Sequence, residues 1–135
     1  MSTNVLINKA ATIERCIARI REDYDDEFRT NYTKQDAIMM NIERACQAAA
    51  DMAAHVVKQR RLGVPQNTRE LFELLEAATI IPTELANGMR AMVGFRNVAV
   101  HNYTALDLRI VENVIENHLE DFTLLARILV TTGDR

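Results

Sequence analysis

Residues that interrupt helices are scarce in this chain, and their scarcity limits its fold more than any other feature. The 135 residues include only two prolines and four glycines, so long stretches contain nothing that would end a helix. Within these stretches apolar residues recur at steps of three and four, which is the period of an α-helix with one buried face. The sequence therefore predicts an all-α fold rather than a sheet with many turns.

The apolar period predicts five helices, one of them short. Their expected ranges are residues 3–28, 33–60, 69–78, 83–101 and 106–131. Thr33 suits the start of the second helix because Asp36 follows three residues later, as in a capping box. Acids at residues 23–27 oppose the dipole of the first helix, so we expect its end to fray. The simplest arrangement is an up-down helical bundle of four long helices plus one short helix, in a single domain over residues 1–135.

Composition and charge exclude several classes of protein. Apolar residues make up 48% and charged residues 26%, as in globular domains. The net charge of -3 argues against a general nucleic-acid coat, although one local basic site is enough to hold a phosphate. The first residues show neither the basic nor the apolar region of a signal peptide, and no apolar run is long enough to cross a bilayer. We therefore expect a cytoplasmic protein with no membrane partner.

The two cysteines, Cys16 and Cys46, each lie on an apolar helix face. No CxxC pair occurs, and no spacing of Cys and His fits a zinc site. We therefore expect two reduced core thiols in a reducing cytoplasm, with no metal and no other cofactor.

The segment Met89–Val100 differs from an ordinary bundle helix because it is apolar nearly all round. After Arg90, its only polar side chains are those of Arg96 and Asn97. A helix at the surface of a bundle needs a single apolar stripe, so this helix should be covered on a second side. We expect a second copy of the chain to cover it, in a two-fold homodimer with this helix at or near the interface.

Arg96 lies on a stripe of core-type residues. Leu85, Met89, Met92, Arg96, Ala99 and Tyr103 follow one another at steps of four, three, four, three and four. An unpaired guanidinium is costly in such a place, and two explanations remain open. Either Arg96 pairs with a buried acid such as Glu43, Asp51 or Glu84, or the stripe opens into a cleft where Arg96 meets an anion.

His101 follows Arg96 by five residues, which an ideal helix places about 140° apart around its axis. An isolated straight helix would not bring the two side chains together. Either the helix ends near His101 and its side chain bends back, or each site combines residues from two subunits. Asn97, four residues before His101, shares its helix face.

The string Arg96-Asn97-Val98-Ala99-Val100-His101-Asn102-Tyr103 reads R-x4-H-x-Y. It resembles the signature of HEPN-domain ribonucleases, especially the HepT toxins that are paired with minimal nucleotidyltransferase antitoxins. The similarity covers about residues 33–125. It includes Asp36-Ala37-Ile38 through Asn41, Asp51 to His55, the loop at 63–65 and Phe72-Glu73-Leu74-Leu75.

The resemblance implies a HEPN-like helical homodimer that acts as the toxin of a type II/VII-like toxin–antitoxin system. Such a protein would be a metal-independent endoribonuclease that cuts RNA, either tRNA or mRNA. His101 would act as general acid or base on a ribose 2'-hydroxyl, whose attack on the adjacent phosphate leaves a 2',3'-cyclic phosphate. Arg96 would hold that phosphate. The residue types agree, because arginine forks match phosphate oxygens and histidine titrates near neutral pH.

The resemblance also implies a modification site at Tyr103. The antitoxin would transfer AMP from ATP onto this tyrosine, and the bulky anionic adduct would repel RNA. Asn97 and Asn102 are supporting or RNA-binding candidates. The alternative hypothesis is a non-catalytic helical binding module that supports a nucleotidyltransferase partner; the intact Arg96 and His101 favour the enzyme.

Three further groups have simpler interpretations. Asp51 and His55 are four residues apart and should form a local structural pair. His118 is interpreted as a histidine at the edge of the bundle. The basic residues Lys58, Arg60 and Arg61 fit a solvated helix end and an RNA contact equally well.

Overall fold

The computed structural model describes residues 2–101 and 107–133, with all their side chains except those of residues 2, 3, 100 and 101. Over that part the chain forms six helices and no strand. They are α1 (Ser2–Asp23), α2 (Tyr32–Gln59), α3 (Thr68–Ala77), α4 (Thr83–His101), α5 (Leu108–Asn117) and α6 (Leu119–Gly133). The prediction of an all-α fold is confirmed.

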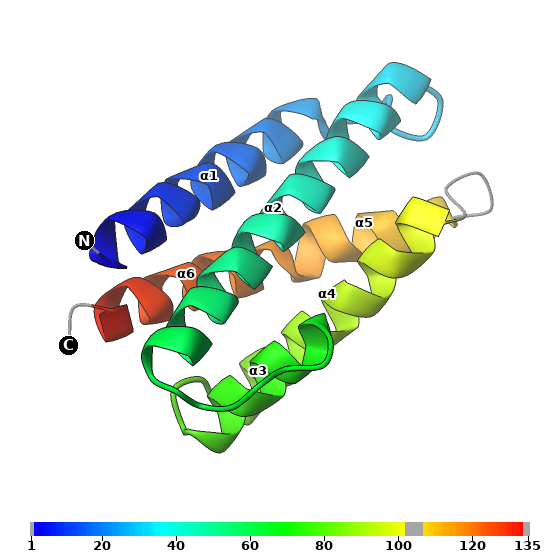
Figure 1. The fold of residues 1–135 in the computed structure, drawn as a ribbon. Helices are drawn as coiled ribbons and strands as arrows, with labels where there is room; N and C mark the ends of the chain where they lie inside the picture. The colour runs from blue at the N-terminus through cyan, green and yellow to red at the C-terminus, as the bar shows by residue number, and fades with distance from the viewer. Residues whose placement is uncertain (1, 102–106, 134–135) are drawn as a thin grey trace.

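The long helices run up and down the molecule. Figure 1 shows α1 and α2 side by side and antiparallel, α4 antiparallel to α2, and α5 and α6 returning along the bundle. α1 packs mainly against α2 and α6, and the short α3 packs against α2 and α4. The start of α1 and the end of α6 therefore lie at one end of the bundle, and the end of α4 lies at the other (Figure 1).

The first helix ends five residues earlier than its period predicts. α1 stops at Asp23, and a turn follows instead of the expected helix to residue 28. The acidic run explains the early end, since acids at a helix C-terminus face the negative end of the dipole. Phe28, only 1% exposed, anchors the turn in the core. Its carbonyl accepts a hydrogen bond from Gln35 Nε2 at 2.8 Å.

The second helix starts one residue before the predicted Thr33. α2 begins at Tyr32, and its N-cap is Asn31, whose side chain accepts a hydrogen bond from the Lys34 N–H. Asparagine is among the strongest N-cap residues, so Asn31 caps the helix in place of Thr33. Thr33 as the cap was therefore wrong, while the existence and end of the helix agree with the prediction.

The predicted last helix, residues 106–131, is divided in two at His118. The His118 N–H donates to the Val114 carbonyl at 2.9 Å at the end of α5, and its carbonyl accepts from the Asp121 N–H at 3.2 Å. The break lets α5 lie against the α1–α2 turn, where Arg29 donates two hydrogen bonds to Glu112 at 2.7 and 3.1 Å. Contacts between distant segments leave no trace in the apolar period, so a single helix was expected here.

Alanines let the neighbouring helices approach α2 closely. Ala45, Ala49 and Ala53 have no exposed surface, and α2 touches α1, α3, α4 and α6. Larger side chains fill the space around them: Ile13, Ile20, Ile38, Ile42, Met52, Leu75, Phe72 and Phe122 are buried. Among the helices described, none is both long and apolar enough to span a bilayer.

A leucine at one of these alanines should strain the bundle. We expect Ala49→Leu to lower the free energy of unfolding by about 1–3 kcal/mol, because the extra carbons have no space. Ala54→Leu, at an exposed position of the same helix, is the matched control and should have little effect. Urea denaturation measures both. Equal stability of the two variants would contradict the close approach of the helices at Ala49.

Candidate active site

The predicted stripe on α4 is present, and Arg96 interrupts it. Leu85, Met89, Met92 and Ala99 are buried, with at most 5% of their surface exposed. Arg96 occupies the same face and is half-buried. α4 therefore carries a guanidinium on the face whose other side chains are buried in the core.

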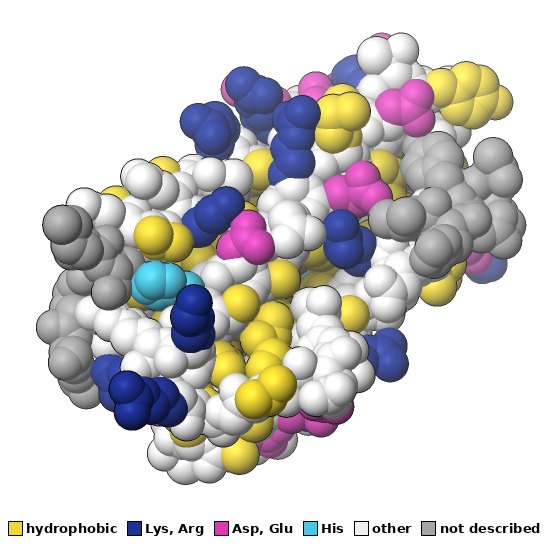
Figure 2. All heavy atoms as spheres, viewed as in Figure 1, with side chains coloured by type: hydrophobic (Ala, Val, Ile, Leu, Met, Phe, Trp, Pro, Cys, Tyr) yellow, Lys and Arg dark blue, Asp and Glu magenta, His cyan; other side chains and the backbone are white. Residues whose placement is uncertain are grey.

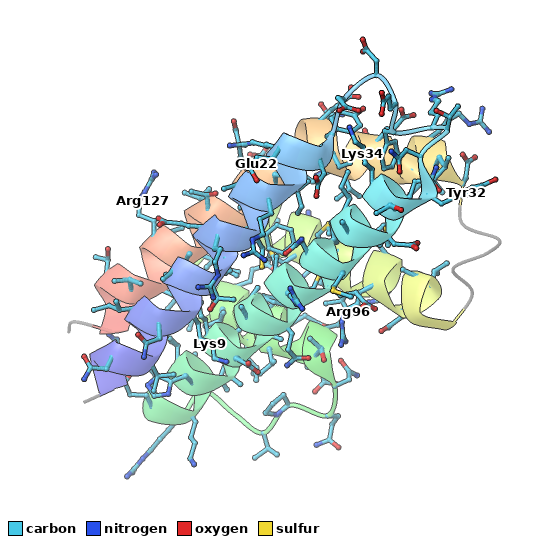
Figure 3. All side chains as sticks on the ribbon, turned by 90° about the horizontal axis from the view of Figure 1, so that it is seen from above. Lys9, Glu22, Tyr32, Lys34, Arg96 and Arg127 are labelled. Atoms are coloured by element: carbon cyan, nitrogen blue, oxygen red, sulfur yellow. The ribbon has the colours of Figure 1, made fainter. Side chains whose placement is uncertain are left out.

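The Arg96 side chain reaches from α4 toward α2 (Figure 3). Its Nη2 donates to Gln47 Oε1 over 3.4 Å, which is long for a hydrogen bond. Its Nε is buried and has no hydrogen-bond partner. A charged group in this position is poorly satisfied by the protein, and such a group has spare capacity for an anion.

The acids proposed as partners do not pair with Arg96. Asp51 instead forms an ion pair with Lys9 at 3.0 Å and accepts a hydrogen bond from Gln47 Nε2 at 2.9 Å. Glu43 and Glu84 take part in no ion pair within the described part of the chain. None of these three acids is therefore the ion-pair partner of Arg96, and the anion site stays a prediction.

Cys46 lies beside Arg96 and stays protonated. Burial raises the pKa of its thiol to about 12, the charge of Arg96 lowers it, and the charge of Glu43 raises it. At neutral pH the thiol therefore carries no charge that would balance the guanidinium. Gln47 is a neutral amide, so the immediate contacts of Arg96 leave its positive charge available.

The other motif residues are described only in part. The backbone of α4 is helical through His101, its last residue, while the His101 side chain, Asn102 and Tyr103 lie outside the described residues. Asn97 is exposed on α4. In a regular helix, positions five residues apart, such as 96 and 101, lie about 140° apart around the axis.

α4 exposes apolar surface away from the core. Val98 is 53% exposed, and Val93 and Phe95 are only partly buried against the core. Met40, in the first third of α2, is 51% exposed. This surface agrees with the expectation that the chain alone does not cover the helix on every side.

Two of the secondary interpretations concern histidines, His55 and His118. Asp51 and His55 do not form the predicted pair: Asp51 binds Lys9, and His55 Nε2 is buried without a hydrogen-bond partner. His118 is half-buried at the α5–α6 break, and its Nδ1 lies 3.3 Å from Asp121 Oδ2.

The basic group at the end of α2 is exposed, and Arg60 donates to the Thr132 carbonyl at 2.7 Å. Arg60 therefore ties the end of α2 to α6. Among the described residues, no group of three or more His, Cys, Asp or Glu side chains is arranged to hold a metal ion.

Two neighbours of Arg96 were missed by sequence reasoning. Gln47 and Cys46 lie on α2, about fifty residues before Arg96 in the chain. A single glutamine on a helix carries no signal of its function. Only the packing of α4 on α2 identifies it as a contact of the motif arginine.

Comparisons with known proteins agree with the motif and the bundle. The family described as "Ribonuclease HepT-like" matches residues 12–128. A curated relative, the "mRNA nuclease HepT" of Shewanella oneidensis, is 45% identical over 121 residues, covering 88% of this chain and 91% of the relative.

Two solved structures are also similar. One is the tri-AMPylated HEPN toxin of Shewanella oneidensis in complex with MNT antitoxin: its TM-score is 0.90 at 42% identity, over 94% of this chain and 97% of that chain. The other is a crystal structure of a toxin–antitoxin with AMP-PNP. Its TM-score is 0.91 at 41% identity, and the match covers 95% of this chain and 98% of that chain. The chain therefore belongs to the HepT-like ribonuclease family.

Proposed function

We propose that this protein is the toxin of a toxin–antitoxin pair and cuts RNA without a metal ion. The observation that carries the proposal is the half-buried guanidinium of Arg96, which stands in the family motif and lacks an acidic partner in the described part of the chain. The relative described as an mRNA nuclease favours mRNA over tRNA as substrate. The proposed unit is one HEPN-like domain over residues 1–135, acting in the cytoplasm.

Arg96 and His101 have complementary tasks in this proposal. The 2'-oxygen of a ribose forms a bond to the adjacent phosphorus, and the bond from phosphorus to the 5'-oxygen breaks. His101 takes the proton of the 2'-hydroxyl or supplies one to the departing 5'-oxygen. Arg96 binds the phosphate oxygens and offsets the charge that develops on them. The products are a 2',3'-cyclic phosphate and a 5'-hydroxyl.

A homodimer would complete the site. The exposed apolar side chains of Val98 and Met40 fit contact with a second copy. The regular course of α4 favours a site in which Arg96 of one subunit faces His101 of the other. Asn97, exposed on α4, and Asn102 would then contact RNA or orient the histidine.

Tyr103 is the proposed point of control. The similar toxin from Shewanella oneidensis is tri-AMPylated in its complex with MNT antitoxin. For this chain we propose that a cognate nucleotidyltransferase antitoxin binds it and transfers AMP from ATP to the hydroxyl oxygen of Tyr103, releasing pyrophosphate. The phosphates of the adduct would occupy the anion site at Arg96 and repel the RNA backbone.

RNA cleavage by the purified chain tests the proposed function. In the presence of EDTA, wild type should cut single-stranded RNA and leave 2',3'-cyclic phosphate ends. Arg96→Ala and His101→Ala should each lower the rate by roughly 10²-fold or more. Arg127→Ala, at an exposed position on α6, is the control and should cut like wild type. Unchanged cleavage by both motif variants would refute the assignment, and loss of all cleavage in EDTA would refute metal independence.

The role of Arg96 also predicts the stability of its variants. Breaking a buried ion pair costs about 3–5 kcal/mol, whereas Arg96→Met removes a charge that no acid balances and should leave the free energy of unfolding unchanged or raise it. Arg90, which pairs with Glu76 at 2.9 Å from the same helix, offers the comparison, because Arg90→Met should lower stability by about 0.2–1 kcal/mol. Urea denaturation distinguishes the two. A loss of several kcal/mol on Arg96→Met would mean that this arginine holds the fold together.

The mass of the chain tests the control at Tyr103. After co-expression with its cognate nucleotidyltransferase, the intact chain should gain one or more AMP units, and peptide mapping should place them on Tyr103. Tyr103→Phe should gain none. Tyr32, which is 78% exposed, serves as an internal comparison for accessible tyrosines. AMP on Tyr32, or on the Tyr103→Phe variant, would contradict a specific site.

A further inference from the structure

Three arginines outside the motif form a cluster of exposed positive charge. Arg15 and Arg19 lie on α1, and Arg44 lies on α2. All three are near the buried Cys16: its pKa is raised by burial, and the charges of Arg44, Arg15 and Arg19 each lower it. Figure 2 shows Lys and Arg side chains gathered over α1 and the facing part of α2. We call Arg15, Arg19 and Arg44 the arginine cluster.

The charges of the arginine cluster are not used within the chain. Ion pairs in the described residues involve other cations, such as Lys9 with Asp51 at 3.0 Å and Arg29 with Glu112 at 2.7 Å. No member of the cluster takes part in one within that part of the chain. In a protein with a net charge of -3, three neighbouring unpaired guanidiniums are a local exception.

The arginine cluster leads toward Arg96. Arg44 precedes Gln47 by three residues on α2, so the two side chains share a helix face. Gln47 in turn accepts the hydrogen bond from Arg96. Arg15 and Arg19 are four residues apart and continue the positive surface for about 6 Å along α1. Arg44 and Arg96 thus lie on either side of Gln47, so the cluster on α1 and α2 lies next to the candidate active site on α4.

We propose that the arginine cluster binds the phosphate backbone of the RNA beyond the point of cleavage. This inference rests on the proposed ribonuclease activity. It assigns to the cluster the part of the RNA that extends over α2, while Arg96 holds the phosphate that is cut. Binding through the backbone depends on cations and not on the base sequence, so the cluster raises affinity for long RNA without selecting the site.

The surface fits RNA better than a protein partner. Protein interfaces are held mainly by apolar and aromatic anchors at their centre. On α1, the large exposed apolar residues Val5 and Ile7 lie in the first half of the helix, away from Arg15 and Arg19. On α2, the exposed Met40 lies one turn before Arg44, so the proposed subunit contact adjoins the cluster at this single side chain. Guanidiniums with free donors match phosphate oxygens directly.

Substrate length provides the test. In the full chain, we would replace the cluster by Arg15→Gln, Arg19→Gln and Arg44→Gln together. The long substrate is a single-stranded RNA of mixed sequence, and the short substrate is a mixture of all dinucleotides. A dinucleotide bound at Arg96 cannot span α2, because packed helices lie roughly 8–10 Å apart. Cleavage of both substrates is measured at several salt concentrations, and binding is measured with a 2'-O-methylated copy of the long RNA, which lacks the attacking hydroxyl.

We expect the triple variant to bind the long RNA about tenfold or more weakly at moderate salt. The slope of log affinity against log salt should fall by about 2, since three single-strand phosphate contacts contribute about 0.7 each. The KM for long RNA should rise, while cleavage of dinucleotides stays at the wild-type rate. A control double variant, Arg21→Gln with Arg127→Gln, removes positive charge from exposed positions outside the cluster and should keep wild-type affinity.

Each other outcome overturns a defined statement. If wild type cuts both substrates but the triple variant keeps its affinity and salt slope, the arginine cluster does not bind RNA, and the proposed function stands. If the triple variant keeps its affinity for RNA but no longer co-purifies with the antitoxin, the cluster is a protein contact and the inference is wrong. If wild type cuts neither substrate, the proposed function itself fails. Urea denaturation of the triple variant checks that any loss of binding is not a loss of folding.

Discussion

The close packing around α2 is the constraint on which the rest of the structure depends. Alanines without exposed surface on this helix let α1, α4 and α6 come near it, so a chain of modest size builds a continuous core. The same packing brings α4 against α2 and sets Arg96 beside Cys46 and Gln47. The environment of the motif arginine is therefore a consequence of helix packing and not of the motif alone.

The electrostatic state of Arg96 follows from what surrounds it. Its neighbours on α2 are an amide and a thiol that burial keeps neutral, and Asp51, one turn after Gln47, is engaged by Lys9 and Gln47. The protein has thus removed the anions that would neutralise this guanidinium from its immediate contacts. A charge held without a counterion is expensive for stability, and enzymes accept such costs where a substrate supplies the missing charge.

Sequence reasoning recovered the helices and the motif but not their contacts. The three-and-four period found the stripe from Leu85 to Ala99, and the R-x4-H-x-Y spacing identified the family to which the chain belongs. The sequence did not predict the break at His118, because that break depends on the packing of α5 against a distant turn. The contact of Gln47 with Arg96 was not predicted for the same reason. The acids expected near Arg96 were proposed only because an unpaired buried charge is costly. Period and motif report the chain's local preferences, whereas pairing between helices is decided in three dimensions.

The protonated thiol of Cys46 has one more consequence. Oxidants attack thiolates that solvent can reach, and this sulfur is buried, with a pKa of about 12. Peroxide in the surrounding solution would therefore not convert it to a sulfenic acid, and no redox-derived anion would form next to the motif arginine. The surroundings of Arg96 are in this respect insulated from oxidants, so oxidation of Cys46 offers no way to neutralise its charge.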